Sequence, residues 1–252
     1  MPWDPECYLK FKAERFAPFE DLLKMIRVRD GMSVIDLGCG TGEMTRRLSD
    51  SLPGSDVLGI DSSQEMLEKA KDYVGPGLGF KSGEIESIEG QWDLVFSNAA
   101  IQWVPDHQAL VPRLLALLNP GGQLAVQLPS NHHHPVYRTI VEIADEEPFR
   151  SALNSWVRNF PVLSVDEYAV LLHEHGGGEI EVFEKVYPHL MKDADALVEW
   201  TSGTVLLPYF DRLSSEVKTA FLNEYRTRLR GLYPTEEILY AFRRTLFSAM
   251  KP

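Results

Sequence analysis

Short apolar runs alternate along the chain with segments in which an apolar residue recurs every three or four positions, called three-four spacing below. Such runs, bounded by turn residues, are typical of buried strands, and three-four spacing is typical of helices that pack on a sheet. The order of these segments predicts an α/β fold of seven strands, with a helical insertion before the last strand. The predicted strands are Val34–Leu37, Val57–Asp61, the strand and its exit within Gly79–Ile85, Trp92–Asn98, Gln123–Leu128, Glu179–Leu190 and Ile238–Phe247.

The stretch that joins the first predicted strand to the following helix is the most informative. Its sequence over Ser33–Gly42, S-V-I-D-L-G-C-G-T-G, places three alternating glycines after an apolar run. Open α/β sheets hold nucleotides at such a turn, because glycine lets the backbone come close to a ligand. A dinucleotide fingerprint counted from Gly38 needs a glycine where Glu43 stands, and a Walker loop needs a lysine that is missing here. A cationic ligand therefore suits the turn better than a phosphate, although an ordinary turn without a ligand is the alternative.

An acidic residue, Asp61, ends the second predicted strand, 25 positions after Asp36. In nucleotide-binding sheets an acid at this place accepts hydrogen bonds from the ribose hydroxyls. The alternative is a helix-capping role, because Ser62 and Ser63 follow and serine is a preferred N-cap residue. We expect the glycine turn and the two acidic strand ends to form one nucleoside site.

The acidic composition narrows the range of partners. The chain has 25 basic and 37 acidic residues and a formal net charge of −12, whereas nucleic-acid surfaces carry a basic stripe. No apolar run approaches the length of about 18 residues that spans a membrane, and Met1–Asp4 does not begin a secretory signal. We therefore expect no nucleic-acid partner, no membrane association and a cytoplasmic location, and the sequence leaves the oligomeric state unknown.

No metal site is predicted. Cys7 and Cys39 form no C-x-x-C pair, and Cys39 is expected to be a small packing residue of the glycine turn. His132, His133 and His134 are consecutive, and adjacent residues do not share a face of a helix or a strand. A metal shared by these three imidazoles is therefore not expected.

Several motifs together resemble one family. The glycine turn, D-x-G-x-G-x-G, resembles the first motif of Rossmann-like S-adenosylmethionine-dependent methyltransferases. The segments W-D-P-x-x-Y-L-x-F-x-A-E-R, S-N-A-A-I-Q-W-V-P-D-H and L-N-P-G-G-x-L-A-V-Q-L-P are similar to those of the trans-aconitate 2-methyltransferase family. The resemblance covers nearly the whole chain. It implies a Rossmann-like, mostly parallel sheet of seven strands with helices on both faces, and S-adenosylmethionine as the cofactor.

The resemblance also implies a division of the single domain, residues 1–252. An amino-terminal segment, approximately 1–30, is expected to cover the cofactor, and approximately 30–129 is expected to form the cofactor-binding core. Approximately 130–178 and 191–236 are expected to form a substrate-binding lid, since loops beyond the strand ends usually recognise the substrate.

The resemblance implies a set of cofactor contacts. Arg15 is expected to meet the cofactor carboxylate bidentately, Glu84 to accept from the adenine amino group, and the backbone around Ile85 to meet an adenine ring nitrogen. Asn98 stands where methyltransferases of nucleic-acid amino groups carry an Asn/Asp-Pro-Pro-aromatic turn, but both prolines and the aromatic residue are missing, so a base is not the expected acceptor. The expected cofactor-binding residues are Arg15, Asp36, Gly38, Gly40, Asp61, Ser62, Glu84, Ile85 and Asn98.

The implied reaction is in-line methyl transfer to a carboxylate of trans-aconitate, which forms a monomethyl ester. A carboxylic acid of pKa about 4 is ionised at neutral pH, so no general base and no catalytic residue are expected. A small anionic polycarboxylate still needs cations or hydrogen-bond donors around it. The expected substrate-binding residues are Trp103, His133, Arg138, Tyr209 and Arg243, with Arg158 as a further candidate.

Two alternatives remain open at this point. A methyltransferase of the quinone or natural-product type, directed to oxygen or carbon, would need a base, and His107 or one of His132–His134 would then supply it. A protein that binds S-adenosylmethionine without catalysis would bind the cofactor tightly and turn over no acceptor.

Overall fold

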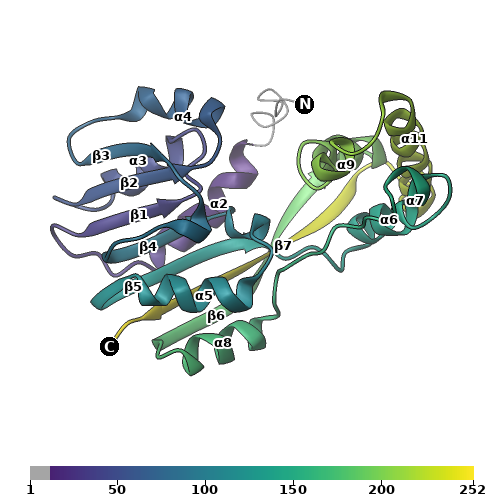
Figure 1. Ribbon diagram of the computed structural model, residues 1–252. Coiled ribbons are helices and arrows are strands. Elements are labelled where there is room, and N and C mark those ends of the chain that lie inside the picture. The colour runs from purple at the N-terminus through teal and green to yellow at the C-terminus, as the bar shows by residue number, and fades with distance from the viewer. Residues whose placement is uncertain (1–11) are drawn as a thin grey trace. The chain divides into compact units, whose positions relative to one another are not determined.

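The computed structural model describes residues 12–252, with side chains from residue 16 onward (Figure 1). Its seven strands form one sheet in the order β3-β2-β1-β4-β5-β7-β6, in which the pairs β1–β2, β2–β3, β1–β4 and β4–β5 are parallel and β5–β7 is antiparallel. The predicted α/β fold with a mostly parallel sheet is thus confirmed. The strands are β1 (Ser33–Leu37), β2 (Asp56–Asp61), β3 (Leu78–Ser82), β4 (Trp92–Asn98), β5 (Leu118–Pro129), β6 (Gly178–Met191) and β7 (Ile238–Met250).

The helices alternate with the strands in the first half of the chain and cluster in the second half. The α-helices are α2 (Lys12–Lys24), α3 (Glu43–Asp50), α4 (Gln64–Ala70), α5 (His107–Ala116), α6 (Pro135–Ala144), α7 (Phe149–Ala152), α8 (Val165–Glu174), α9 (Ala194–Ser202), α10 (Leu207–Phe210) and α11 (Ser215–Leu232). Single 3-10 turns are η1 (Lys71–Tyr73), η2 (Ile85–Ser87) and η3 (Ile101–Trp103).

The chain divides into two compact units. The core unit contains residues 17–130, 161–185 and 244–252, and the second unit contains residues 131–160 and 186–243 of the structured chain. The long strands β6 and β7 each contribute one part to the core unit and one part to the second unit. Helix α8 and the start of β6 fall in the core unit. The assignment of a substrate-binding lid to parts of the chain after residue 130 stays a prediction.

The sheet of the core unit is buried on both faces, because neighbouring strand residues alternate between two apolar clusters. Val34 of β1 packs with Phe19 and Leu48 from α2 and α3, whereas its neighbour Ile35 packs with Leu110 from α5 in a cluster that also includes residues of α8. This period of two is the pattern of a strand between two helical layers. The second unit has its own apolar cluster, which includes residues of α6, α9 and α11.

Strand β5 corrects one of the sequence-based expectations. The fifth strand was predicted to begin at Gln123, but Asn119–Gly122 also lie inside β5. The register shifts there, since Trp92 pairs with Leu118 while Leu94 pairs with Gln123. A contact with the end of the chain explains why β5 begins early, because the N–H of Gly121 donates to the carbonyl of Lys251 at 2.8 Å.

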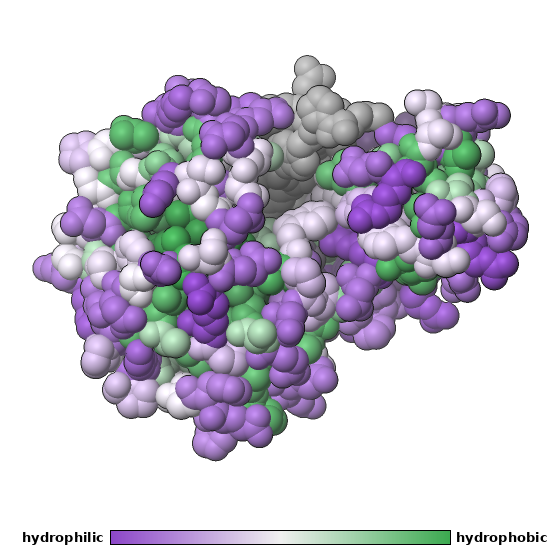
Figure 2. Space-filling view, in the orientation of Figure 1, coloured by the Kyte–Doolittle hydropathy of each residue, from purple (hydrophilic) through white to green (hydrophobic). Residues whose placement is uncertain are grey.

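Among residues 12–252, no helix combines the length and the apolar character that crossing a membrane requires. Figure 2 shows hydrophilic residues spread over the visible faces of both units, in keeping with the 62 charged residues implied by 25 basic and 37 acidic side chains.

Candidate active site

The carboxyl ends of β1, β2 and β4 form the candidate site, all within the core unit. The strand order reverses between β1 and β4, because β2 and β3 lie on one side of β1 while β4 and β5 lie on the other. In open α/β sheets, ligands bind outside the carboxyl ends of the strands at such a switch point. Asp36, Gly38, Gly40, Asp61 and Asn98 belong to these strand ends or follow them directly.

The glycine turn is tied to the neighbouring strand by its backbone. The N–H groups of Gly38 and Cys39 both donate to the carbonyl of Ile60, at 2.8 and 2.9 Å. A Cβ on Gly38 would lie 2.2 Å from the Cβ of Ala100, so the turn after β4 packs directly on this glycine. A larger residue at the first position of the turn would therefore clash with Ala100.

Gly40 differs from Gly38 because it faces open space. Its φ is +55°, and no atom lies within 4 Å of the place where a Cβ would stand. Its N–H donates to Oδ2 of Asp61 at 2.9 Å. The backbone of the turn is therefore open for close approach at this one position, beside a carboxylate.

Asp61 links the end of β2 to both the glycine turn and α4. Besides the bond from Gly40, its Oδ1 accepts from the N–H of Ser63 at 2.8 Å. Ser63 is the N-cap of α4, and its hydroxyl accepts from the N–H of Met66, while Ser62 is exposed beside Asp61. The cap of α4 is thus a serine side chain, and each oxygen of the half-buried Asp61 carboxylate keeps acceptor capacity for a ligand.

Asp36 lies below the surface of the site. Its side chain is 3% exposed, and the hydroxyl of Thr45 on α3 donates to it at 2.6 Å. Burial raises the pKa of Asp36 to about 7, the nearby Asp61 adds to the rise, and the Thr45 hydrogen bond opposes it. Asp36 therefore anchors α3 to β1 and contributes negative charge beneath the turn when it is ionised.

Cys39, in the same glycine turn, has a free and buried thiol. Burial first, and then the charges of Asp36 and Asp61, raise the pKa of this thiol well above its usual range. The thiol is therefore protonated and unreactive at neutral pH, as expected of a packing residue.

The exit of β3 lies beside the glycine turn. Strand β3 ends at Ser82, and Glu84 is an exposed residue that precedes η2. The Cδ1 atom of Ile85 lies 3.9 Å from the place of a Cβ on Gly38. The structure thus brings Ile85 to the site and leaves the Glu84 carboxylate at the surface next to it.

The end of β4 carries a hydrogen-bond network that the sequence did not reveal. Oδ1 of Asn98 accepts from Nε2 of Gln127 at 2.7 Å, and Oε1 of Gln127 accepts from Nη1 of Arg244 at 3.3 Å. Gln127 is fully buried and Arg244 is 6% exposed. The only sequence signal for these two residues is a polar or charged side chain within an apolar strand, and neither residue was among the candidates.

His107 is the first residue of α5 and is buried in the core unit. Its Nε2 lies 2.8 Å from the carbonyl oxygen of Ile101, and its Nδ1 is hydrogen-bonded to the hydroxyl of Tyr168. Burial lowers the pKa of His107. Both nitrogens of this ring are engaged inside the protein, so His107 is not arranged to accept a proton from an external acceptor.

The residues predicted to bind substrate lie in different surroundings. Trp103 on η3 belongs to the core unit and is 50% exposed, whereas the other four belong to the second unit. Arg138 is exposed and pairs with Glu142 on its own helix at 3.6 Å, and His133 is exposed with its ring 4.1 Å from that of His132. The structure does not bring the full predicted set together in one unit.

Tyr209 and Arg243 complete that set. Tyr209 is fully buried, and its phenol oxygen accepts from the N–H of Arg158 at 3.3 Å, so it serves the packing of the second unit. Arg243 is exposed, and its N–H donates to Oδ1 of Asn131 at 2.6 Å.

The side chain of Arg15 and the first eleven residues of the predicted amino-terminal segment lie outside the described residues. Within the described part of the chain, no group of three or more His, Cys, Asp or Glu is arranged to hold a metal.

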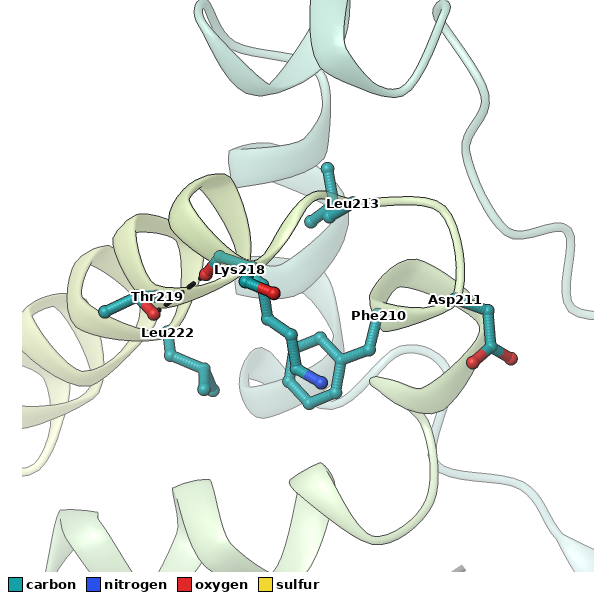
Figure 3. A pocket seen from close by; sticks show the side chains of 7 residues that line it. Phe210, Asp211, Leu213, Lys218, Thr219 and Leu222 are labelled. Atoms are coloured by element: carbon teal, nitrogen blue, oxygen red, sulfur yellow. Dashed lines mark hydrogen bonds between the residues drawn. The ribbon is translucent and has the colours of Figure 1, made fainter. Parts of the chain in front are cut away.

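A pocket of about 460 Å³ lies in the second unit, between α10 and the start of α11 (Figure 3). The ammonium of Lys218 lies 4.3 Å from the centre of the Phe210 ring, and the hydroxyl of Thr219 donates to the carbonyl of Ser215 at 2.9 Å. None of the predicted substrate residues lines this pocket. Its lining residues are Phe210, Asp211, Leu213, Ser215, Lys218, Thr219 and Leu222.

Comparison with known proteins identifies relatives of this chain. A family model described as a methyltransferase domain matches residues 34–122, which contain the glycine turn and the ends of β2 and β4. A trans-aconitate 2-methyltransferase of Deinococcus radiodurans is 44% identical over 258 residues, covering 100% of this chain and 99% of the relative.

Solved structures share the fold at low sequence identity. The YcgJ protein of Bacillus subtilis has a TM-score of 0.62 and 16% identity, covering 94% of this chain and 98% of that one. Phosphoethanolamine N-methyltransferase 2 of Haemonchus contortus, solved in complex with S-adenosyl-L-methionine, has a TM-score of 0.56 and 18% identity, covering 94% of this chain and 52% of that one.

Proposed function

The chain belongs to the trans-aconitate 2-methyltransferase family, and we propose that it transfers a methyl group from S-adenosylmethionine to a carboxylate of trans-aconitate, forming a monomethyl ester. It is an S-adenosylmethionine-dependent enzyme of the class that the whole-length relative names. Which of the three carboxylates accepts the methyl group follows from the family name alone and remains part of the proposal.

The observation that carries the proposal is the open backbone of Gly40 beside Asp61. No atom lies within 4 Å of a Cβ at Gly40, and the Asp61 carboxylate is fixed by the N–H groups of Gly40 and Ser63. A nucleoside without phosphates fits this turn, because its ribose hydroxyls can donate to Asp61 while Glu43 would repel a pyrophosphate at the helix start. When bound, S-adenosylmethionine supplies a methyl group on a positively charged sulfur.

We assign the cofactor contacts by their places around the turn. The backbone at Gly38 and Gly40 would receive the cofactor, Asp61 would accept from the ribose, and exposed Ser62 would stand beside it. Glu84 and Ile85 at the exit of β3 would border the adenine, and Asn98 would face the site from the end of β4. Asp36 supports the turn from below, and Arg15 stays a prediction from the family resemblance.

The proposed methyl transfer requires the protein to align the two substrates but not to activate the acceptor. A carboxylate of trans-aconitate is already ionised at neutral pH, so the attacking oxygen needs no general base. The burial of His107, with both ring nitrogens engaged, agrees with a reaction that does not use it as a base. Catalysis is then the in-line placement of the acceptor oxygen and the exclusion of water, and no residue is assigned a covalent or acid-base step.

The acceptor carries three negative charges in a protein of net charge −12, so it needs local cations. A cation at 4 Å contributes on the order of 4 kcal/mol at an effective dielectric of 20, before desolvation, and distant acids are screened. Exposed Arg138, Arg243 and His133, together with half-exposed Trp103, remain the proposed contacts. Tyr209 is the weakest member of the set because its side chain is fully buried.

We also propose a cytoplasmic location and a small-molecule substrate as the functional partner, without nucleic acid or membrane. The free thiol of Cys39 inside the cofactor turn suits a reducing compartment. The acidic net charge does not suit binding to nucleic-acid phosphates.

The test is an acceptor screen with a methyl-labelled donor. Purified protein is incubated with labelled S-adenosylmethionine and, separately, with trans-aconitate, cis-aconitate, isocitrate, a phenol and a quinol. We expect the largest kcat/KM with trans-aconitate. Methylation of the phenol or quinol without any polycarboxylate would support a quinone or natural-product enzyme instead. Tight cofactor binding without turnover of any acceptor would support a binding protein.

A further inference from the structure

We propose that His107 and Tyr168 form a positioning pair that holds the turn after β4 against the glycine turn and thereby sets the affinity for the cofactor. The inference rests on the proposed function, in which this turn borders the cofactor. The sequence suggested His107 only as the base of the alternative quinone or natural-product enzyme and did not suggest Tyr168 at all. Neither residue is expected to touch the substrate or the cofactor.

The turn after β4 has a conformation that must be held from outside. Ala99 has a φ of +55°, in the left-handed region that residues other than glycine rarely adopt. Its N–H donates to the carbonyl of Gln127 at 2.9 Å, and its own carbonyl accepts from Nε2 of Gln102 at 2.7 Å. Such conformations persist only where the surrounding structure fixes them, and they concentrate at functional sites.

This turn after β4 also contacts the glycine turn. Ala100 follows directly, and its Cβ occupies the space above Gly38, 2.2 Å from the place of a Cβ there. Asn98 precedes the turn and Trp103 follows it on η3. A shift of the turn would therefore move both the packing on Gly38 and two residues that are proposed to face ligands.

His107 fixes η3 through a defined pattern of hydrogen bonds. The carbonyl of Ile101 can only accept, so Nε2 of His107 carries the hydrogen and donates to it at 2.8 Å. Nδ1 of the neutral ring is then the acceptor, and the hydroxyl of Tyr168 donates to it. The phenol oxygen in turn accepts from the N–H of Leu163 at 3.3 Å. A chain of bonds thus runs from the segment before α8 to η3.

Burial makes this arrangement a rigid one. His107 is 1% exposed and Tyr168 is not exposed, and the ring of Tyr168 stacks on Phe247 of β7 with 4.7 Å between ring centres. The lowered pKa of His107 agrees with a neutral ring that keeps one tautomer near neutral pH. Hydrogen bonds between fully buried groups fix side-chain positions more strictly than exposed ones, because an unmade bond leaves a desolvated polar group.

The experiment compares cofactor binding among four variants of the full chain. His107→Leu removes both hydrogen bonds and keeps an apolar side chain, whereas His107→Gln keeps an N–H near the position of Nε2. Tyr168→Phe removes only the hydroxyl. His175→Leu is the matched control, since His175 also meets a carbonyl, that of Leu171 at 2.9 Å, but at the end of α8 away from the turn.

The dissociation constant of S-adenosylmethionine is measured by titration calorimetry, and folding is checked by thermal unfolding. We expect Kd to rise roughly tenfold in His107→Leu and roughly threefold in Tyr168→Phe. We expect His107→Gln to recover most of the loss and His175→Leu to bind like the wild-type chain. A merely structural role would lower the unfolding temperature without changing the Kd of the folded protein.

Unchanged Kd in a folded His107→Leu protein would overturn the inference. If that variant does not fold, Tyr168→Phe decides the matter, because it keeps the ring and its packing, and an unchanged Kd there overturns the inference equally. Failure of the wild-type chain to bind S-adenosylmethionine would contradict the proposed function itself, and the inference with it. If the wild-type chain binds S-adenosylmethionine and the variants bind it more weakly, the result supports the proposed function and the inference.

Discussion

Replacement of Asp61 by alanine is the perturbation whose effect can best be worked out from the structure. The carboxylate accepts from Gly40 at 2.9 Å and from Ser63 at 2.8 Å, and a carboxylate has about four acceptor positions, so about two remain for the ribose hydroxyls. Hydrogen bonds to a charged group contribute about 1.5–3 kcal/mol. The loss converts to a Kd for S-adenosylmethionine that is roughly 10- to 150-fold higher.

Titration calorimetry with S-adenosylmethionine measures this change directly. Asp56→Ala is the matched control, because Asp56 is an exposed acid at the opposite end of the same strand. The control removes the same charge from β2 and is expected to leave Kd within about twofold of the wild-type value. A folded Asp61→Ala protein that binds the cofactor as tightly as the control would refute the assignment of Asp61 to the site.

Three further predictions concern the glycine turn, the buried acid and a surface pair. Gly40→Val should raise the cofactor Kd more than about 100-fold, as measured by titration calorimetry. The control Gly176→Val introduces the same left-handed strain in open space at the end of α8 and should leave Kd unchanged, so equal affinities of the two variants would contradict the prediction. Because burial raises the pKa of Asp36 to about 7, the contribution of this residue to stability is fully present below about pH 4 and is lost as the pH rises through about 7. Asp36→Asn should remove this loss of stability, which thermal unfolding between pH 4 and 8 measures. Arg138→Ala, which breaks an exposed 3.6 Å pair with Glu142, should lower the free energy of unfolding by less than about 1 kcal/mol in urea denaturation, and a larger loss would mean that the pair is structural.

The fold was predictable because its signals are local. The apolar run before Gly38 and the acid at the end of the next strand are separated by short segments, and strand β4 was predicted over the residues that the structure shows, Trp92–Asn98. Alternation of apolar runs and three-four spacing needs no knowledge of distant contacts. The family resemblance then supplied the cofactor, and the whole-length relative confirms the family.

The parts that could not be predicted depend on contacts between distant segments. Asn119–Gly122 has the composition of a turn, but pairing of Gly121 with Lys251 draws it into β5. The pairing of His107 with Tyr168 joins residues 61 positions apart, and that of Gln127 with Arg244 joins residues 117 apart. Neither pair follows a spacing rule, so each is visible only in the folded chain.

The burial of the basic residues in β7 could not be predicted for the same reason. Arg243 and Arg244 are adjacent in the sequence, yet one is exposed and the other is 6% exposed, because successive strand residues point to opposite faces. Which face would be buried depends on the pairing of β7 with β5 and on the helices that cover them. Tyr209 was likewise chosen for its chemistry, while its burial among the aromatic residues of the second unit was not foreseeable.

The measurement that most directly tests the central claim is the position of the transferred methyl group. After turnover of trans-aconitate with methyl-labelled S-adenosylmethionine, the isolated product is treated with mild alkali. Transfer to a carboxylate oxygen predicts that the label is released as methanol and that trans-aconitate is recovered. Label that stays on the acceptor after alkali, or no label on trans-aconitate while a phenol is methylated, would contradict the account.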